Sequence, residues 1–130
     1  MENGEKFIAR LNAADRFCVH NNIRLLRAAD GSSEAELVVT DDSLNAGGVV
    51  QGGAIFTLAD FAFAVACNNA HRPSVAQQAS LNFLNASRGK RLISTAYCVK
   101  NGRSSCVYRI EIKDDLGKDI AQAMFTGFKL

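Results

Sequence analysis

Apolar residues are densest between residues 54 and 67, where only Thr57 and Asp60 are polar. A helix that is apolar on every side normally lies inside a protein. The segment is almost long enough to span a lipid bilayer. However, its single carboxylate lies near the middle, and no second apolar segment of this length follows. The pattern therefore predicts a central helix buried in the core of a globular domain.

Shorter patterns precede this helix. Residues 5–17 carry apolar side chains at helical spacing, which predicts a first helix. Alternating positions predict a strand over residues 23–29 and a partner strand over residues 33–40, joined by a turn at Asp30-Gly31. Residues 41–51 then form a loop that leads into the central helix.

The chain after the central helix is rich in alternating patterns. Asn68 and Asn69, with Pro73 just beyond them, indicate where the helix ends. His71 is expected beside the last carbonyls of the helix. Asn101-Gly102 is a strong hairpin signal. Four strands are predicted here, over residues 75–84, 92–100, 104–113 and 119–129.

The predicted order is therefore one short helix, two strands, the central helix and four strands. A six-stranded antiparallel sheet has to cover its apolar face, and the central helix is the element that can do so. A chain of 130 residues is large enough for one such core. We predict a single α+β domain over residues 1–130, with the sheet wrapped around the long helix.

Composition and charge exclude several classes of protein. The chain has 48% hydrophobic and 22% charged residues, as globular proteins do, and its net charge of +2 is too small to indicate nucleic-acid binding. Four scattered cysteines without a Cys-x-x-Cys pair favour free thiols over disulfides or a metal site, and His20 lacks neighbouring ligands. The charged first residues do not resemble a signal peptide. We expect a cytoplasmic protein that binds no membrane.

Candidate chemistry lies where the glycine-rich loop of residues 45–53 enters the central helix. A helix N-terminus offers free N–H groups and partial positive charge, and glycine lets a substrate approach the backbone closely. Asp60 lies seven residues after Gly53, on the same helix face. No Lys, Arg or His lies between residues 28 and 70, so burial would raise its pKa. Asp60 is either a structural residue or a general base or nucleophile, and we favour the second interpretation.

Together these features resemble the hotdog fold and, more narrowly, the PaaI-type acyl-CoA thioesterases. The resemblance covers about residues 22–129, and its central block is specific because loop, helix start and acid are in register. The residues that carry it are Asn45, Gly52-Gly53, Phe56-x-Leu58-Ala59-Asp60, Ala64-x-Ala66-x-Asn68, Ser80-Leu81-Asn82-Phe83-Leu84 and Gly89.

The resemblance implies hydrolysis of an acyl-CoA thioester to a free acid and coenzyme A, without a metal or redox cofactor. It puts the backbone N–H of Gly52 or Gly53 in the oxyanion role and Asp60 in the role of general base or nucleophile. Asn45 would help position the carbonyl or the attacking water. The resemblance also implies a homodimer or a dimer of dimers, in which Asp60 acts on a thioester held by the glycine turn of the other subunit.

Two positions depart from the family pattern. Gln51 stands where most relatives have His, and glutamine forms hydrogen bonds but does not shuttle protons near neutral pH. Ala76 stands where the family has a Ser or Thr that holds water, although Gln77 or Gln78 beside it can substitute. These departures leave a second interpretation open, a non-catalytic acyl-CoA-binding domain that senses or sequesters its ligand.

A cluster of basic residues, Arg88, Lys90 and Arg91, lies in the turn between two predicted strands. Arg and Lys recognise phosphate through charge-assisted hydrogen bonds, so the cluster is a candidate site for the nucleotide end of coenzyme A. The alternative is a solvated turn that protects a sheet edge. The sequence predicts neither the acyl group nor the choice between dimer and tetramer.

Overall fold

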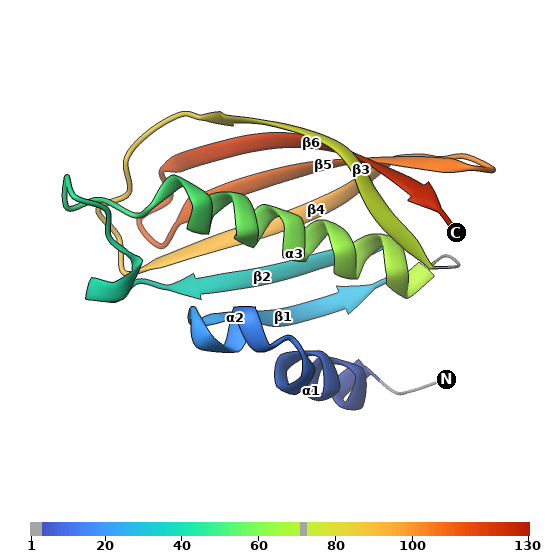
Figure 1. The fold of residues 1–130 in the computed structure, drawn as a ribbon, viewed down its shortest axis with the longest axis horizontal. Coiled ribbons are helices and arrows are strands. Elements are labelled where there is room, and N and C mark those ends of the chain that lie inside the picture. The colour runs from blue at the N-terminus through green and yellow to red at the C-terminus, as the bar shows by residue number, and fades with distance from the viewer. Residues whose placement is uncertain (1–3, 71–72) are drawn as a thin grey trace.

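The computed structural model describes residues 4–70 and 73–130. Its sheet has six antiparallel strands in the order β1-β2-β4-β5-β6-β3, so β1 and β3 are the edges. Figure 1 shows the sheet behind α3, with α1 and α2 beside β1. The elements are α1 (Gly4–Ala14), α2 (Arg16–His20), β1 (Ile23–Ala29), β2 (Ser32–Val38), the 3-10 helix η1 (Asp41–Ser43), α3 (Gly52–Ala70), β3 (Ser74–Phe83), β4 (Arg91–Asn101), β5 (Ser105–Asp114) and β6 (Asp119–Lys129). The predicted hotdog arrangement of sheet and central helix is confirmed.

The core forms where α3 packs against the concave face of the sheet. Phe63 of α3 stacks on Phe125 of β6 with ring centroids 5.0 Å apart, and meets Tyr108 of β5 edge-on at 5.7 Å. All three rings are buried, as are Leu58 and Cys67 of the same helix. Among the helices of the described residues, none is long and apolar enough to cross a lipid bilayer.

One face of α3 is not covered by the sheet. Gly53, Phe56 and Asn68 are exposed there, and Asp60 and Ala64 are half-buried between them. These five residues, which we call the open stripe, repeat at intervals of three or four positions and so share one helix face. The expectation of a helix buried on every side is therefore wrong for this face within one subunit.

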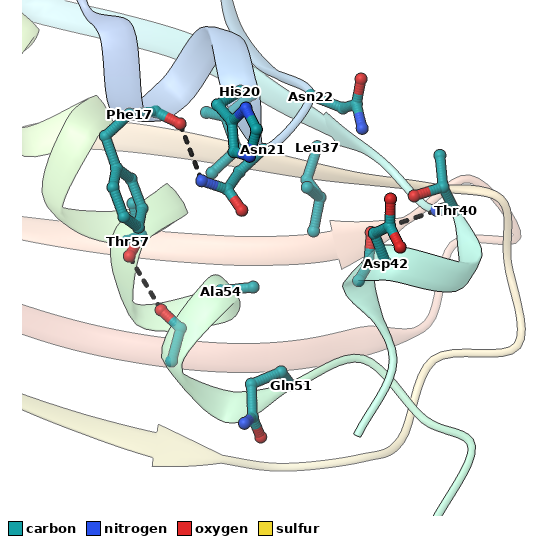
Figure 2. A pocket seen from close by; sticks show the side chains of 13 residues that line it. Phe17, His20, Asn21, Asn22, Leu37, Thr40, Asp42, Gln51, Ala54 and Thr57 are labelled. Atoms are coloured by element: carbon teal, nitrogen blue, oxygen red, sulfur yellow. Dashed lines mark hydrogen bonds between the residues drawn. The ribbon is translucent and has the colours of Figure 1, made fainter. Parts of the chain in front are cut away.

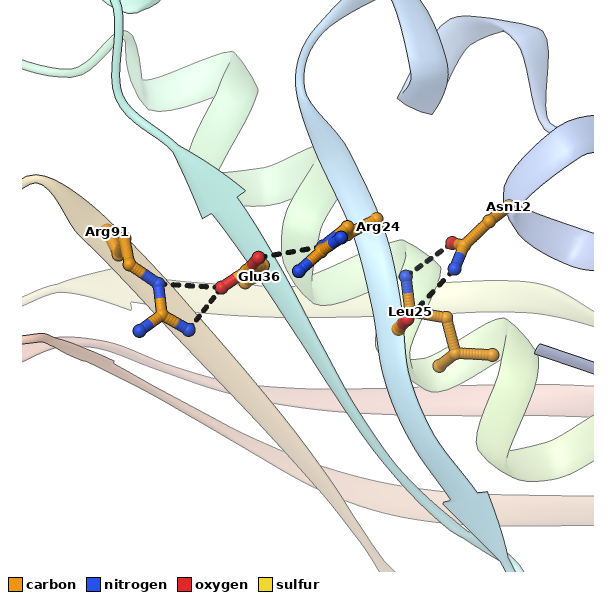
Figure 3. Close-up of polar contacts among 5 residues, drawn as sticks. All are labelled: Asn12, Arg24, Leu25, Glu36 and Arg91. Atoms are coloured by element: carbon orange, nitrogen blue, oxygen red, sulfur yellow. Dashed lines mark hydrogen bonds and ion pairs between the residues drawn. The ribbon is translucent and has the colours of Figure 1, made fainter. Parts of the chain in front are cut away.

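The N-terminal segment is two helices, where the sequence predicted one over residues 5–17. Asp15 interrupts the pattern because its carboxylate accepts a hydrogen bond from the Cys18 N–H at 3.0 Å, which makes it the N-cap of α2. Asn12 of α1 exchanges two hydrogen bonds with the backbone of Leu25 in β1, at 3.0 and 2.6 Å (Figure 3). These contacts fix α1 and α2 against the edge of the sheet.

The end of α3 is fastened by the two asparagines that the sequence placed there. Asn68 receives a hydrogen bond from the Ser74 N–H at 2.9 Å, which ties the helix end to the first residue of β3. Asn69 receives one from the Gly31 N–H at 3.0 Å, in the β1–β2 turn. His71 lies outside the described residues, so its predicted contact with the helix end stays a prediction.

Both predicted hairpins are present, with different turns. Asp30 and Gly31 have φ values of 51° and 78°, as the two central residues of a tight left-handed turn require. The Asn101-Gly102 hairpin has a longer loop. Its strands stop pairing at Asn101 and Cys106, and the Gly102 N–H donates to the Ser105 carbonyl at 2.8 Å.

Candidate active site

The glycine-rich loop is held in shape by Asn45. Its side-chain oxygen accepts hydrogen bonds from the N–H groups of Gly47 at 2.9 Å and Val49 at 3.3 Å. Its own N–H donates to the Val49 carbonyl at 2.8 Å, and Gly48 completes the turn with a φ of 79°. Within the described chain the Asn45 amide nitrogen has no hydrogen-bond partner, so this group is available to a ligand.

Gln51 occupies the position before α3 and acts through its backbone. Its carbonyl accepts hydrogen bonds from Ala54 N–H at 3.0 Å and Ile55 N–H at 3.2 Å, and its N–H donates to the Ser43 carbonyl at 2.8 Å. These bonds fix the start of the helix. The Gln51 side chain is exposed and lies beside the cavity shown in Figure 2.

The two glycines at the start of α3 have different surroundings. Among the described residues, neither the Gly52 nor the Gly53 N–H has a hydrogen-bond acceptor. A Cβ on Gly52 would lie 3.3 Å from the Phe83 ring, whereas one on Gly53 would meet no atom within 4 Å. The Gly53 side of the turn is therefore open to a ligand, and the Gly52 side is packed.

Asp60 is half-buried on the open stripe. Its carboxylate has no hydrogen bond or ion pair with any described residue. Burial raises the pKa of Asp60, and the negative charge of nearby Asp15 raises it further. A carboxylate in this state is a stronger base than an exposed one, and a candidate for proton transfer.

A cavity of about 370 Å³ opens beside the glycine turn (Figure 2). Phe17 and His20 of α2 lie on one side of it, and Gly53 and Thr57 of α3 lie on the other. Sequence reasoning missed this cavity because it depends on how α2 is placed over the start of α3. The lining does not include Asp60, which is further along the helix.

The remaining polar candidates lie apart from this cavity. Ala76, Gln77 and Gln78 are exposed on the edge strand β3, where the pairing with β6 shifts between Ala76 and Gln78. None of the three lines the cavity beside the glycine turn. All three side chains are exposed within one subunit, so a role for them in holding water stays a prediction.

The basic cluster separates into two kinds of residue. Arg88 lines a groove of about 520 Å³ between the glycine-rich loop and the β3–β4 connection, and Lys90 is exposed beside it. The Arg91 guanidinium instead donates to Glu36, with the Nε atom 2.7 Å from a carboxylate oxygen, and Arg24 donates to the other oxygen at 2.8 Å (Figure 3).

Glu36 is only 2% exposed, although it lies on a strand that faces solvent on one side. Burial alone would raise its pKa, but the hydrogen bonds from Arg91 and Arg24 outweigh that effect and lower the pKa. Arg91 therefore serves the stability of the sheet. Sequence reasoning missed this ion pair because it joins residues 55 positions apart.

The chain is similar in sequence to known thioesterases. Residues 47–121 match the family described as the thioesterase superfamily. The acyl-coenzyme A thioesterase PaaI of Escherichia coli K12 is 34% identical over 106 residues, which are 81% of this chain and 74% of that protein.

Two solved structures share the fold. The E. coli PaaI protein from the phenylacetic acid degradation operon superposes with a TM-score of 0.88 and 28% identity, covering 94% of this chain and 89% of that one. A Streptococcus mutans protein bound to acetyl-CoA has a TM-score of 0.78 and 30% identity, covering 82% and 87%. The chain described here therefore belongs to the thioesterase superfamily, as a hotdog-fold thioesterase of the PaaI type.

Proposed function

We propose that this thioesterase hydrolyses an acyl-CoA thioester to a free acid and coenzyme A, with Asp60 as general base or nucleophile. The observation that carries the proposal is an unpaired half-buried carboxylate, Asp60, on the same open helix face as Gly53, whose N–H is free among the described residues. The similarity to PaaI supports the reaction. A solved relative bound to acetyl-CoA supports the coenzyme.

In the base mechanism, the Asp60 carboxylate takes a proton from water while the water oxygen attacks the thioester carbon. The negative charge that develops on the carbonyl oxygen is received by a backbone N–H at the start of α3. The C–S bond then breaks, and the coenzyme A sulfur takes the proton from Asp60. In the nucleophile mechanism, the carboxylate attacks the carbon itself, and the C–S bond breaks to give a mixed anhydride and the coenzyme A thiolate. Water then hydrolyses the anhydride, which releases the free acid, regenerates the Asp60 carboxylate and supplies the proton that the thiolate takes up.

Between the two glycines, the surroundings favour Gly53 for the oxyanion role. Its side of the turn is open, while the Phe83 ring occupies the space beside Gly52. Asn45 can direct its free amide nitrogen at the carbonyl or the attacking water, and Gln51 braces the turn through its backbone. Water is the only co-substrate that this reaction needs.

A homodimer completes the site in this proposal. Asp60 and Gly53 of one helix are roughly 10 Å apart along its axis, because seven residues each rise 1.5 Å. One carboxylate therefore does not reach a carbonyl bound at its own glycine turn. The open stripe and the exposed edge strand β3, with Val75 49% and Phe83 57% exposed, offer a second copy an apolar surface.

The phosphates of coenzyme A are assigned to Arg88 and Lys90 rather than to Arg91. Arg88 faces the groove beside the glycine-rich loop, and neither Arg88 nor Lys90 has a side-chain ion pair with any described residue. Arg91 already has two guanidinium nitrogens committed to Glu36. The groove leads a bound coenzyme away from the thioester position without crossing the core.

Steady-state kinetics on acyl-CoA esters test the proposal through Asp60→Asn. This substitution should lower kcat by on the order of a hundredfold or more, because the base or nucleophile is lost while the shape is kept. Asp119→Asn, which alters an exposed carboxylate on β6, serves as the control and should leave kcat unchanged. Equal rates for Asp60→Asn and the native protein would overturn the mechanism.

The second candidate function is acyl-CoA binding without catalysis, and Gln51 is the observation that favours it. Glutamine at this position does not transfer protons near neutral pH. Saturable binding of acyl-CoA with no release of free thiol over long incubation would establish this function. Turnover that depends on Asp60 would exclude it.

A further inference from the structure

The cavity between α2 and α3 has a wall that suits an apolar group. Phe17, Ile23, Leu37 and Ala54 contribute carbon surface to it, and Gly53 lies on the same wall. Phe17 is 62% exposed, an unusual state for an aromatic ring and one that a bound apolar group would relieve. An acyl group whose carbonyl lies on the Gly53 N–H has this cavity beside it.

Other parts of the lining are polar and uncommitted. His20 and Asn22 lie across the cavity from Gln51 in Figure 2, and Asp42 lies at its side. Within the described chain, the side chains of His20, Asn22 and Asp42 have no hydrogen bond or ion pair. Two polar neighbours are already engaged, because Asn21 donates to the Phe17 carbonyl at 2.8 Å and Thr57 to the Gly53 carbonyl at 2.9 Å.

The charge and the size of the cavity limit further which ligands can occupy it. Among the described residues that line the cavity, Asp42 is the only Asp, Glu, Lys or Arg, so a terminal carboxylate on the occupant meets a like charge and no lysine or arginine. A volume of about 370 Å³ is near the lower end of the range for ligand pockets. The cavity therefore suits a compact group with an apolar body and a neutral polar end.

We propose that this cavity binds the acyl group and selects compact acyl chains with a neutral hydrogen-bonding group, such as a hydroxyl, at the far end. This inference rests on the proposed acyl-CoA hydrolysis. The apolar wall holds the acyl chain. Hydrogen bonds then form between the far end of the acyl chain and the side chains of His20, Asn22 and Asp42. Chains that end in a methyl group leave these polar side chains without a partner, and chains that end in a carboxylate meet the Asp42 charge.

Three thioesters with seven non-hydrogen atoms along the acyl chain test the selection, namely heptanoyl-CoA, 6-hydroxyhexanoyl-CoA and hexanedioyl-CoA. We expect kcat/KM to be highest for the hydroxyacyl ester and lowest for the ester with the free carboxylate. Asp42→Asn should raise the rate with hexanedioyl-CoA about fivefold relative to heptanoyl-CoA, because the like charge is removed. Asp41→Asn changes the neighbouring residue of η1, which does not line the cavity, and should leave this ratio unchanged.

Filling the cavity provides a second test. Ala54→Leu should lower kcat/KM for heptanoyl-CoA at least tenfold more than for acetyl-CoA, because only the longer chain needs the space. Unchanged ratios in both Asp42→Asn and Ala54→Leu, with turnover that depends on Asp60, would overturn the inference and leave the proposed function standing.

The inference also has a readout that does not need catalysis. The dissociation constants of S-heptyl-CoA and S-(6-hydroxyhexyl)-CoA, which are thioethers and cannot be hydrolysed, should show the same preference for the hydroxyl. Ala54→Leu should weaken the binding of both. If no thioester is hydrolysed, the proposed function fails, and thioether binding unaffected by Ala54→Leu would overturn the cavity assignment separately.

Discussion

Asp60 illustrates what one residue can reveal before its surroundings are known. The sequence showed an acid inside an apolar segment with no basic residue nearby, and the absence of an ion pair among the described residues confirms this expectation. The second acid beside it, Asp15, lies 45 positions earlier in the chain and was not foreseen. The sequence shows that no basic residue lies near Asp60 along the chain, but only the folded structure shows which charges from distant parts of the chain come close to it.

Asp15 offers a test of how the Asp60 pKa is set. A base has to be unprotonated, so kcat/KM should rise with pH through the pKa of Asp60. Burial and the Asp15 charge both raise that pKa above its usual 3.8. Asp15→Asn removes the charge but keeps a good helix cap, and it should move the acidic limb of the pH profile to lower pH. Asp119→Asn should leave the limb in place.

The buried Glu36 carboxylate gives a prediction about stability. Glu36→Gln should lower the free energy of unfolding by about 2 kcal/mol near neutral pH, because three charge-assisted hydrogen bonds are weakened in a buried position. Glu34→Gln is the matched control, because Glu34 lies two residues before Glu36 on β2 and so on the same face of the sheet, and it should have little effect. Denaturant unfolding followed by circular dichroism measures both.

The same residue predicts a pH dependence of stability. The pKa of Glu36 is lowered in the folded protein relative to its usual 4.5. Its contribution is therefore complete above about pH 4.5 and is lost as pH falls through the lower folded value. The difference in stability between the native protein and Glu36→Gln should shrink below pH 4.5. A constant difference down to pH 3 would contradict this linkage.

At the scale of elements, periodicity predicted all six strands of the described residues and the long helix, and failed where a single polar side chain overrides it. Asp15 lies at a position that continues the helical pattern, yet its carboxylate caps a new helix. The open stripe of α3 was also hidden, because the composition of a helix does not distinguish a face that stays open within one subunit from one buried in the core.

Gly127 on β6 tests how closely the sheet approaches α3. A Cβ at this position would lie 2.8 Å from the Cys106 sulfur and 2.9 Å from the Phe63 ring, both of which are buried. Gly127→Ala should therefore destabilise the fold by about 1–3 kcal/mol through overpacking. Gly4→Ala, where a Cβ meets no atom within 4 Å, is the control. Thermal unfolding of the two variants separates crowding from the general effect of replacing glycine.

At the scale of the whole molecule, the proposed site is divided between two subunits, and mixing of inactive variants tests this division. Asp60→Asn removes the acid, and Gly53→Leu fills the open side of the glycine turn, where a Cβ meets no atom within 4 Å. Each variant alone should have almost no activity. In a two-fold symmetric dimer of one variant with the other, one of the two sites receives an intact acid and an intact turn.

Equal amounts of the two variants, unfolded together and refolded, should therefore recover about a quarter of the native activity, since half of the dimers are mixed and each has one working site. Two copies of Asp60→Asn refolded in the same way are the control and should recover none. If the acid and the turn of the same subunit worked together, both subunits of a mixed dimer would carry a defective site. Mixing would then restore nothing, and the distance along α3 would have to be bridged by a rearrangement within one chain.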